Sequence, residues 1–153
     1  MDFSDRAATW DDDPEKVRNA REVAAAIRRN LTLTGSERVL EFGAGTGLLS
    51  RELRDEVAGI LMTDAAAGMV EVARRRIAEL GAEDRLQAAL FDPTSRDADP
   101  GTFDVIWSIL ALHHVPDMEQ ALVRLRGLLE PGGRLALADL AEDPGGSFHQ
   151  AHG

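Results

Sequence analysis

The segment from Val39 to Ser50 constrains the fold of this chain more than any other stretch. It reads VLEFGAGTGLLS, so an apolar run ends in an acid and then breaks into three alternating glycines. Glycine lacks Cβ and adopts positive φ angles easily, which lets a ligand approach the backbone closely. A helix that starts behind such a turn offers amides and a partial positive charge. The segment therefore predicts a strand, a nucleotide-binding turn and a helix start, and it favours a ligand with an adenosine part.

The spacing of those glycines narrows the choice of ligand. Gly43, Gly45 and Gly47 follow a G-x-G-x-G pattern. The dinucleotide fingerprint G-x-G-x-x-G places its third glycine at the position that Leu48 occupies here. An NAD-binding domain is therefore disfavoured, although it stays an alternative for the function.

Length and composition indicate one soluble domain. A chain of 153 residues with 44% hydrophobic residues can fill a single core. It has no run of eighteen apolar residues, and its first twenty residues are acidic where a secretory signal would be basic and then apolar. We therefore expect a cytoplasmic protein that binds no membrane. The chain has no cysteine, which excludes disulfides, thiolate metal sites and cysteine nucleophiles.

The negative net charge argues against nucleic acid as a partner. Two clusters of like charge, one basic and one acidic, need a separate interpretation. The net charge of −10 repels a phosphate backbone, and Arg74–Arg76 is interpreted as a solvated helix face rather than a basic patch. Asp11–Asp13 suggests a metal site, but three carboxylates followed by Pro14 are more typical of a helix cap. We expect neither bound nucleic acid nor a bound metal.

Apolar periodicity predicts strands that alternate with helices. Apolar residues from Val17 to Leu31 recur at intervals of three and four, which indicates an amphipathic helix behind Pro14. The expected strands cover residues 38–42, 59–63, 86–91, 103–109 and 135–140, and the expected helices cover 14–31, 46–56, 66–80 and a segment from Pro116 to a break at 131–133. Leu80 is expected on a buried helix face, followed by Gly81 as a left-handed cap. This order predicts an α/β fold with a doubly wound parallel sheet.

Polar residues and glycines follow four consecutive strands at the point where each strand ends. Glu41 and the glycine turn end the first strand, Asp64 follows the second, Asp92 follows the third, and residues 108–114 follow the fourth. In a doubly wound sheet, ligands bind outside the carboxyl ends of the strands, near the point where strand order reverses. We therefore expect these residues to form one site.

Asp64 has the spacing of a ribose-binding acid. It lies 17 positions beyond Gly47, close to the interval of about 20 at which an acid reaches a ribose diol. The alternative is that Asp64 only caps the helix that follows it; together with the glycine turn, we favour the ribose. Asp92 stands before Pro93, so a turn residue is the alternative to a ligand contact there.

Five segments resemble, in order and spacing, the motifs of one family. They are LEFGAGTG at 40–47, Thr63–Asp64 with Met69 downstream, FDVIWS at 103–108, LHHV at 112–115 and LEPGGRL at 129–135. With them the chain resembles class I S-adenosylmethionine (SAM)-dependent methyltransferases of the small kind grouped as types 11 and 12, over nearly its whole length. The resemblance implies a Rossmann-like sheet of strand order 3-2-1-4-5 and SAM as the cofactor.

The resemblance implies roles for residues on the methionine side of the cofactor. The backbone of Gly43 and Gly45, in the turn that Gly47 completes, would face the methionine moiety. Glu41 would orient the ammonium group, directly or through water, and Ser108 would line the same side. Carboxylates and carbonyls suit an ammonium group because they accept its hydrogen bonds.

On the adenosine side, the resemblance implies contacts from the second and third strand tips. Asp64 would bind the ribose, and Ala65 would lie beside the adenine. Asp92, preceded by Phe91, would contact the adenine amino group.

The resemblance implies methyl transfer by in-line displacement. The leaving group departs neutral and needs no acid, so the rate comes chiefly from positioning and, for a protonated acceptor, from a base. His113 and His114 are the only candidate bases near the strand tips, and a packed or capping pair is the favoured alternative. We expect a small-molecule acceptor, whose identity the fold does not specify.

The expected organisation is one SAM-binding domain over residues 1–153. Residues 1–34 would form an N-terminal lid segment and a helix, in which Phe3 and Trp10 either close over the cofactor or pin the helix to the body. Residues 35–140 would form the sheet core, and 141–153 a shortened connector.

Only 13 residues follow Leu140, so the antiparallel hairpin that ends the sheet in the resembled family is expected to be missing. A fragment, an engineered chain or a naturally short protein would each have this length. The fifth strand would then be an exposed edge, which suggests a homodimer through that edge. The same gap favours the main alternative function, a catalytically silent SAM-binding module.

Overall fold

The computed structural model describes residues 3–139, with the side chains of residues 7–139. Its centre is a five-stranded parallel sheet of order β3-β2-β1-β4-β5. The strands are β1 (Arg38–Phe42), β2 (Gly59–Asp64), β3 (Leu86–Leu90), β4 (Phe103–Ile109) and β5 (Leu129–Ala138). Strand order therefore reverses between β1 and β4. The predicted α/β fold and the order 3-2-1-4-5 are confirmed.

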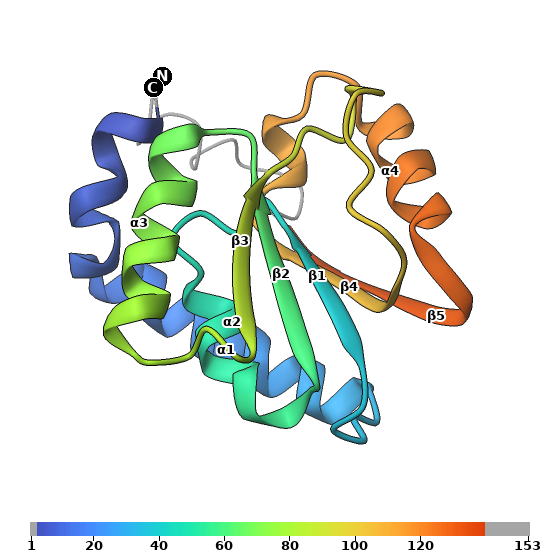
Figure 1. Cartoon of the computed structure of the whole chain (residues 1–153), viewed down its shortest axis with the longest axis horizontal. Coiled ribbons are helices and arrows are strands. Elements are labelled where there is room, and N and C mark those ends of the chain that lie inside the picture. Colours follow the sequence, from blue (N-terminus) through green and yellow to red (C-terminus); the bar gives the residue numbers. More distant parts are fainter. Residues whose placement is uncertain (1–2, 140–153) are drawn as a thin grey trace, which may run out of the picture.

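Helices cover both faces of the sheet (Figure 1). The α-helices are α1 (Pro14–Asn30), α2 (Leu48–Leu53), α3 (Ala67–Glu79) and α4 (Met118–Gly127), and the 3-10 helices are η1 (Phe3–Asp12), η2 (Arg54–Glu56) and η3 (Leu112–His114). Figure 1 shows α1, α2 and α3 on one side of the strands and α4 on the other. The sheet is thus doubly wound, as predicted. None of the helices in residues 3–139 is long and apolar enough to cross a membrane.

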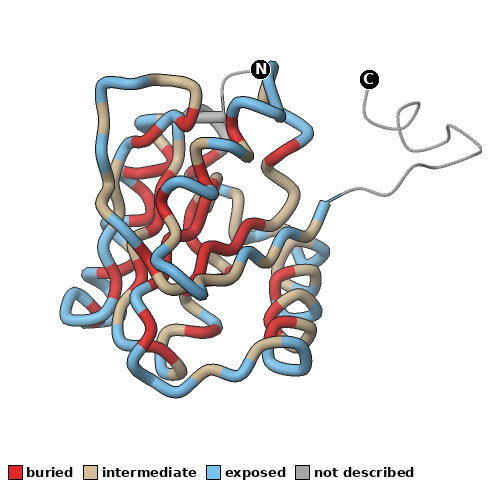
Figure 2. The backbone as a smooth tube through the Cα atoms, turned by 90° about the vertical axis from the view of Figure 1, so that its right-hand side faces the viewer, coloured by how far each residue is buried: buried red, intermediate tan, exposed pale blue. Residues whose placement is uncertain are grey.

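Each face of the sheet has its own core, because successive strand residues point to opposite sides. Val39 packs with residues of α2 and α3 in one cluster, whereas its neighbour Leu40 packs with Leu125 of α4 in the other. All three are fully buried. Figure 2 shows the buried positions concentrated in the central strands and the inner sides of the helices.

Two helix caps follow the sequence predictions. The side chain of Asp13 accepts a hydrogen bond from the Glu15 amide at 2.9 Å, with Pro14 as the first residue of α1. Gly81 has a φ of +61° and follows the end of α3. The cap interpretation of Asp11–Asp13 is therefore confirmed for Asp13. It is wrong for Asp11, whose carboxylate bonds elsewhere.

Three predicted helix positions are wrong. α2 begins at Leu48 rather than at Thr46, because Gly47 takes the N-cap position in a left-handed conformation. α4 begins at Met118 rather than at Pro116, because the Asp117 side chain caps it by accepting a hydrogen bond from Gln120. Leu80 is 47% exposed rather than buried, because it follows the end of α3.

The predicted break at residues 131–133 lies inside β5. Phe103 pairs with Leu129, and Val105 pairs with Arg134, so β5 carries three more residues than β4 between these two pairs. Gly132 absorbs part of the irregularity with a φ of +79°. β5 therefore begins six residues before the predicted start at Leu135. The predicted end at Leu140 and the connector 141–153 lie outside the described residues.

Candidate functional site

The glycine loop, residues 43–47, follows β1 at the point where strand order reverses. Gly43, Gly45 and Gly47 have φ angles of +63°, +58° and +87°. A Cβ atom on Gly43 would lie 2.3 Å from the Cβ of Ala111, and one on Gly47 would lie 2.4 Å from the Sδ of Met62. All three positions favour glycine for their backbone conformation, and Gly43 requires it for space as well, because the Cβ of Ala111 cannot rotate away. The predicted turn is confirmed.

Asp64 joins the tip of β2 to this loop. Its Oδ2 accepts a hydrogen bond from the Gly45 amide at 2.9 Å, and its Oδ1 accepts one from the Ala66 amide at 2.8 Å. The Ala44 amide donates to the Thr63 carbonyl at 2.8 Å. The carboxylate therefore lies against the glycine loop and bonds to the turn before α3. It does not cap α3, whose N-cap residue is Ala66 and which has no side-chain cap, so the capping alternative is wrong. Each carboxylate oxygen can accept a further hydrogen bond.

Glu41 lies fully buried at the end of β1. Its Oε1 accepts a hydrogen bond from the Ser50 hydroxyl at 3.0 Å, and Trp107 Nε1 donates to that hydroxyl at 3.3 Å. Within the described part of the chain, its Oε2 has no hydrogen-bond partner. Burial raises the pKa of Glu41 to about 8, and the hydrogen bonds from Ser50 and Trp107 offset only part of that effect. Burial therefore favours the neutral form of this side chain.

The third strand tip carries Phe91 and Asp92. Phe91 is buried, and its amide donates to the Asp64 carbonyl at 3.0 Å. Asp92 is exposed, and its Oδ1 accepts hydrogen bonds from the Thr94 amide at 2.8 Å and the Thr94 hydroxyl at 2.7 Å. Asp92 thus holds the turn that the alternative predicted, while it stands directly after the strand. Ala65 is exposed beside Asp64.

The tip of β4 is hydrogen-bonded to both neighbouring strands, β1 and β5. Ser108 is buried, and its hydroxyl donates to the Phe42 carbonyl of β1 at 2.8 Å. Leu110 has a φ of +53°, an unusual conformation for a residue with a side chain. Its amide donates to the Ala138 carbonyl at 2.7 Å, so pairing with β5 holds it in place. This irregular backbone ends β4 beside the glycine loop.

The two candidate bases differ in their surroundings. His113 Nδ1 lies 2.6 Å from Asp139 Oδ1, and the His113 amide donates to Asp139 Oδ2 at 3.2 Å. The ring centroids of His113 and His114 lie 3.9 Å apart. Burial lowers the pKa of His114, and the neighbouring His113 lowers it further. Asp139, at the end of β5, is a site neighbour that the sequence patterns did not reveal.

The N-terminal segment reaches the glycine loop. The indole Nε1 of Trp10 lies 3.8 Å from the Cβ position of Gly45, and the Lys16 ammonium lies 3.4 Å from the centre of the indole ring. Asp11 accepts a hydrogen bond from the Thr46 hydroxyl. This role of Asp11 was not predicted from the sequence, although a helix cap requires only one of the three adjacent acids. Phe3 has no described side chain.

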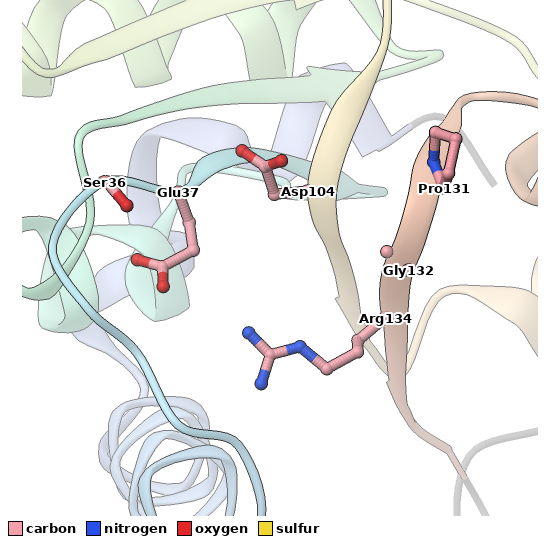
Figure 3. A pocket seen from close by; sticks show the side chains of 7 residues that line it. Ser36, Glu37, Asp104, Pro131, Gly132 and Arg134 are labelled. Atoms are coloured by element: carbon pink, nitrogen blue, oxygen red, sulfur yellow. The ribbon is translucent and has the colours of Figure 1, made fainter.

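A separate hollow of about 360 Å³ lies at the opposite end of the sheet (Figure 3). Polar groups there hold the segment before β1 against the sheet. Arg134 Nη2 donates to the Thr32 carbonyl at 3.1 Å, and Asp104 Oδ2 accepts from the Arg38 amide at 2.8 Å. None of the predicted site residues lines this hollow. We therefore place the candidate site at the carboxyl ends of the strands, where the glycine loop and the strand-tip acids meet.

Comparison with known proteins decides the family. The sequence model of the methyltransferase domain family matches residues 40–135, which include the glycine loop and the four strand tips. The chain belongs to this family. The resemblance to class I SAM-dependent methyltransferases is thereby confirmed.

Individual relatives give the extent of the similarity. The methyltransferase GfsG of Streptomyces halstedii is 34% identical over 115 residues, which cover 74% of this chain and 41% of GfsG. The ubiquinone biosynthesis O-methyltransferase of Xanthomonas euvesicatoria pv. vesicatoria is 33% identical over 138 residues, which cover 88% of this chain and 57% of that enzyme. This methyltransferase-family chain thus spans about half the length of the curated relatives that it matches.

Solved structures share the fold. The DhpI–SAM–HEP complex superposes with a TM-score of 0.74 at 24% sequence identity, over 99% of this chain and 68% of the DhpI chain. At this identity, the likeness concerns the fold alone. It matches the doubly wound sheet that the sequence analysis predicted.

Proposed function

We propose that this chain forms the SAM-binding part of a methyltransferase that acts on a small-molecule acceptor. The observation that carries the proposal is the Asp64 carboxylate at the tip of β2, hydrogen-bonded to the Gly45 amide of the glycine loop. An acid and a loop with little side-chain cover thus lie together at the crevice where doubly wound sheets bind ligands. The relatives support the proposal, since two are named methyltransferases and DhpI was solved with SAM.

The donor and acceptor groups present fit the methionine end of SAM. Glu41 Oε2 is a buried acceptor without a hydrogen-bond partner in the described chain, and the ammonium group of SAM would satisfy it directly or through water. Gly43 and Gly45 would let the ligand reach the backbone of the loop. Ser108 would line the same side through its backbone, because its hydroxyl is already bonded to Phe42.

The adenosine end of SAM would lie across the tips of β2 and β3. Asp64 has acceptor capacity left on both oxygens, which suits the two vicinal hydroxyls of a ribose. Ala65, exposed and without a bulky side chain, would lie beside the adenine. Asp92, next to the buried Phe91, would accept from the adenine amino group while it holds its turn.

Position is the main chemical contribution of this chain. When bound, SAM supplies a methyl group activated by a sulfonium centre. Glu41, the glycine loop and Asp64 would fix the two ends of the cofactor, so that an acceptor meets the methyl group in line. The leaving group departs neutral, so the protein has no need of a general acid.

For an acceptor that must lose a proton, His113 is the base that we propose. Asp139 Oδ1 lies 2.6 Å from Nδ1, which favours a proton on Nδ1 and leaves Nε2 as the accepting nitrogen. Nitrogen-15 chemical shifts of the imidazole should therefore show the Nδ1–H tautomer at high pH. The Nε2–H tautomer would contradict this role.

Isothermal titration calorimetry tests the cofactor assignment. We expect saturable binding of S-adenosylhomocysteine (SAH) and none of NADH. Asp64→Asn should weaken SAH binding about tenfold, because an amide nitrogen cannot accept a ribose hydrogen bond. Asp55→Asn is the matched control, since Asp55 is exposed on η2 at the opposite end of the sheet. Binding of NADH instead of SAH would favour the dinucleotide alternative, and well-folded protein that binds no SAH would reject the proposal.

Two expectations stay predictions. One is the cytoplasmic location. The other is a homodimer through β5, which lies at the edge of the sheet in the described chain, with Leu135 and Leu137 exposed. Analytical ultracentrifugation should detect the dimer, and a monomer at high protein concentration would contradict it.

A further inference from the structure

Asp11 contacts the glycine loop and the two helices beside it, α2 and α3. Its Oδ1 accepts a hydrogen bond from the Thr46 hydroxyl of the loop. Its Oδ2 accepts one from Arg51 Nη2 of α2 at 2.5 Å, and the same oxygen lies 3.4 Å from Arg76 Nε of α3. One carboxylate at the end of η1 therefore joins the N-terminal segment to the loop, to α2 and to α3.

These contacts are sheltered from water. The Asp11 side chain is 14% exposed and that of Arg51 is 17% exposed, while Thr46 is fully buried. Charge-assisted hydrogen bonds in such surroundings are stronger than ion pairs on an open surface. The contacts of Asp11 with Thr46, Arg51 and Arg76 therefore link the N-terminal segment to the rest of the structure and do not form a solvated surface.

Arg51 extends the contact to the far end of the loop. Its Nε donates to the Gly47 carbonyl at 3.3 Å, while its Nη2 donates to Asp11. Asp11 thus reaches two consecutive loop residues, Thr46 directly and Gly47 through the guanidinium. The Asp11 carboxylate is therefore in direct or one-step contact with the part of the loop behind Gly45.

Trp10, the residue before Asp11, packs between η1 and α3 beside the glycine loop. In η1, Ala7 is buried against Met69 and Val72 of α3, with Trp10 packed against this cluster. The Trp10 indole then stands beside Gly45. The Asp11 bonds and the Trp10 indole therefore lie next to each other at the same side of the loop.

We propose that Asp11 is a positioning residue for cofactor binding, which holds residues 45–47 and Trp10 in the arrangement that accepts the adenosyl ligand. This inference rests on the proposed function. Without the Asp11 carboxylate, Thr46 loses its acceptor and Arg51 loses its ion pair. The loop is then less ordered before the ligand binds, and the free energy of ordering it weakens cofactor binding.

The test compares Asp11→Asn with Asp12→Asn in the full chain. Asp12 is the adjacent acid, it is exposed, and its substitution makes the same change in charge. Calorimetry should show SAH binding weakened about tenfold by Asp11→Asn and less than twofold by Asp12→Asn. An unchanged dissociation constant in folded Asp11→Asn protein overturns the proposal.

A double-mutant cycle separates positioning from general destabilisation. Alanine at position 11 leaves Thr46 no acceptor there, whereas the oxygen of asparagine could still accept from it. If Asp11 acts through Thr46, the variant with both Asp11→Ala and Thr46→Val should therefore bind SAH no more weakly than Asp11→Ala alone. Full additivity of the two losses overturns the pathway through Thr46. Circular dichroism confirms that each variant is folded.

Acrylamide quenching of tryptophan fluorescence measures how accessible the Trp10 indole is to solvent, in the absence of any ligand. The chain has two tryptophans, and Trp107 is fully buried, so quenching reports chiefly on Trp10. Asp11→Asn should increase quenching, and Asp12→Asn should leave it unchanged. If the wild type binds no SAH, the proposed function fails, whereas equal quenching in the two variants overturns the positioning by Asp11 itself.

Discussion

The Glu41→Gln variant is expected to be about 3–5 kcal/mol more stable than the wild type at pH 9. Burial raises the pKa of Glu41 from 4.5 to about 8. Above that pH, the folded wild type holds a charged carboxylate in a fully buried position, which is costly. Glutamine stays neutral at every pH and keeps a carbonyl oxygen for the Ser50 hydroxyl.

The pH dependence of this effect has a defined sign. Between pH 4.5 and about 8, the folded state keeps a proton on Glu41 that the unfolded state has released. The free energy of unfolding therefore falls as the pH rises, by up to about 1.4 kcal/mol per pH unit from this one group. The stabilisation of the fold by the proton on Glu41 is complete below pH 4.5 and is lost above pH 8. The stability of Glu41→Gln does not have this pH dependence.

Urea unfolding at pH 5, 7 and 9 measures the difference, with Glu37→Gln as the control. Although burial acts in the opposite direction, hydrogen bonds from Thr34 and Gly35 lower the pKa of Glu37. Glu37→Gln should therefore be less stable than the wild type, by an amount that is constant between pH 7 and pH 9. A gap between Glu41→Gln and the wild type that stays constant from pH 5 to pH 9 would contradict a neutral buried carboxyl.

Gly43→Ala is expected to destabilise the fold by about 3–5 kcal/mol. Its backbone has a φ of +63°, and a Cβ atom would lie 2.3 Å from the Cβ of Ala111. Ala111 lies on the backbone turn between β4 and η3, so the clash cannot be relieved by rotating a long side chain. The tip of β4 or the loop has to move.

Gly81→Ala is the control that measures the cost of the backbone conformation without a steric clash like the one at Gly43. Gly81 has a φ of +61°, almost the same as that of Gly43, but nothing lies within 4 Å of its Cβ position. We expect this variant to lose only about 1 kcal/mol. Urea unfolding measures both variants, and a difference between them of less than about 1 kcal/mol would show that the loop does not need space at Gly43.

Local pattern was sufficient for the elements and for the glycine loop. Apolar periodicity located strands such as β1 and β4 to the residue, because each is a short buried run bounded by turn signals. Three glycines after the first strand predicted the loop with positive φ angles. The strand order came from the resemblance, because periodicity alone does not tell which strands are neighbours.

The start of α4 at Met118 and the exposure of Leu80 have local causes, a side-chain cap and a helix end, but the other errors involve contacts between residues far apart in sequence. Thr46 looked like a helix start, but its hydroxyl bonds to Asp11, 35 residues earlier. The break at 131–133 looked like a loop, but pairing with β4 keeps it in β5 as a bulge. Asp139 lies at the site only because the tip of β5 lies beside that of β4. Pairwise contacts of this kind leave no local pattern in a single sequence.

Chemical-shift mapping with SAH would locate the ligand directly, and we propose that it lies between the glycine loop and the tip of β2. In ¹H–¹⁵N spectra of the labelled protein, we expect the largest shifts at the amides of Gly43, Gly45 and Ala65. Shifts confined to the hollow around Glu37 and Arg134, at the other end of the sheet, would contradict it.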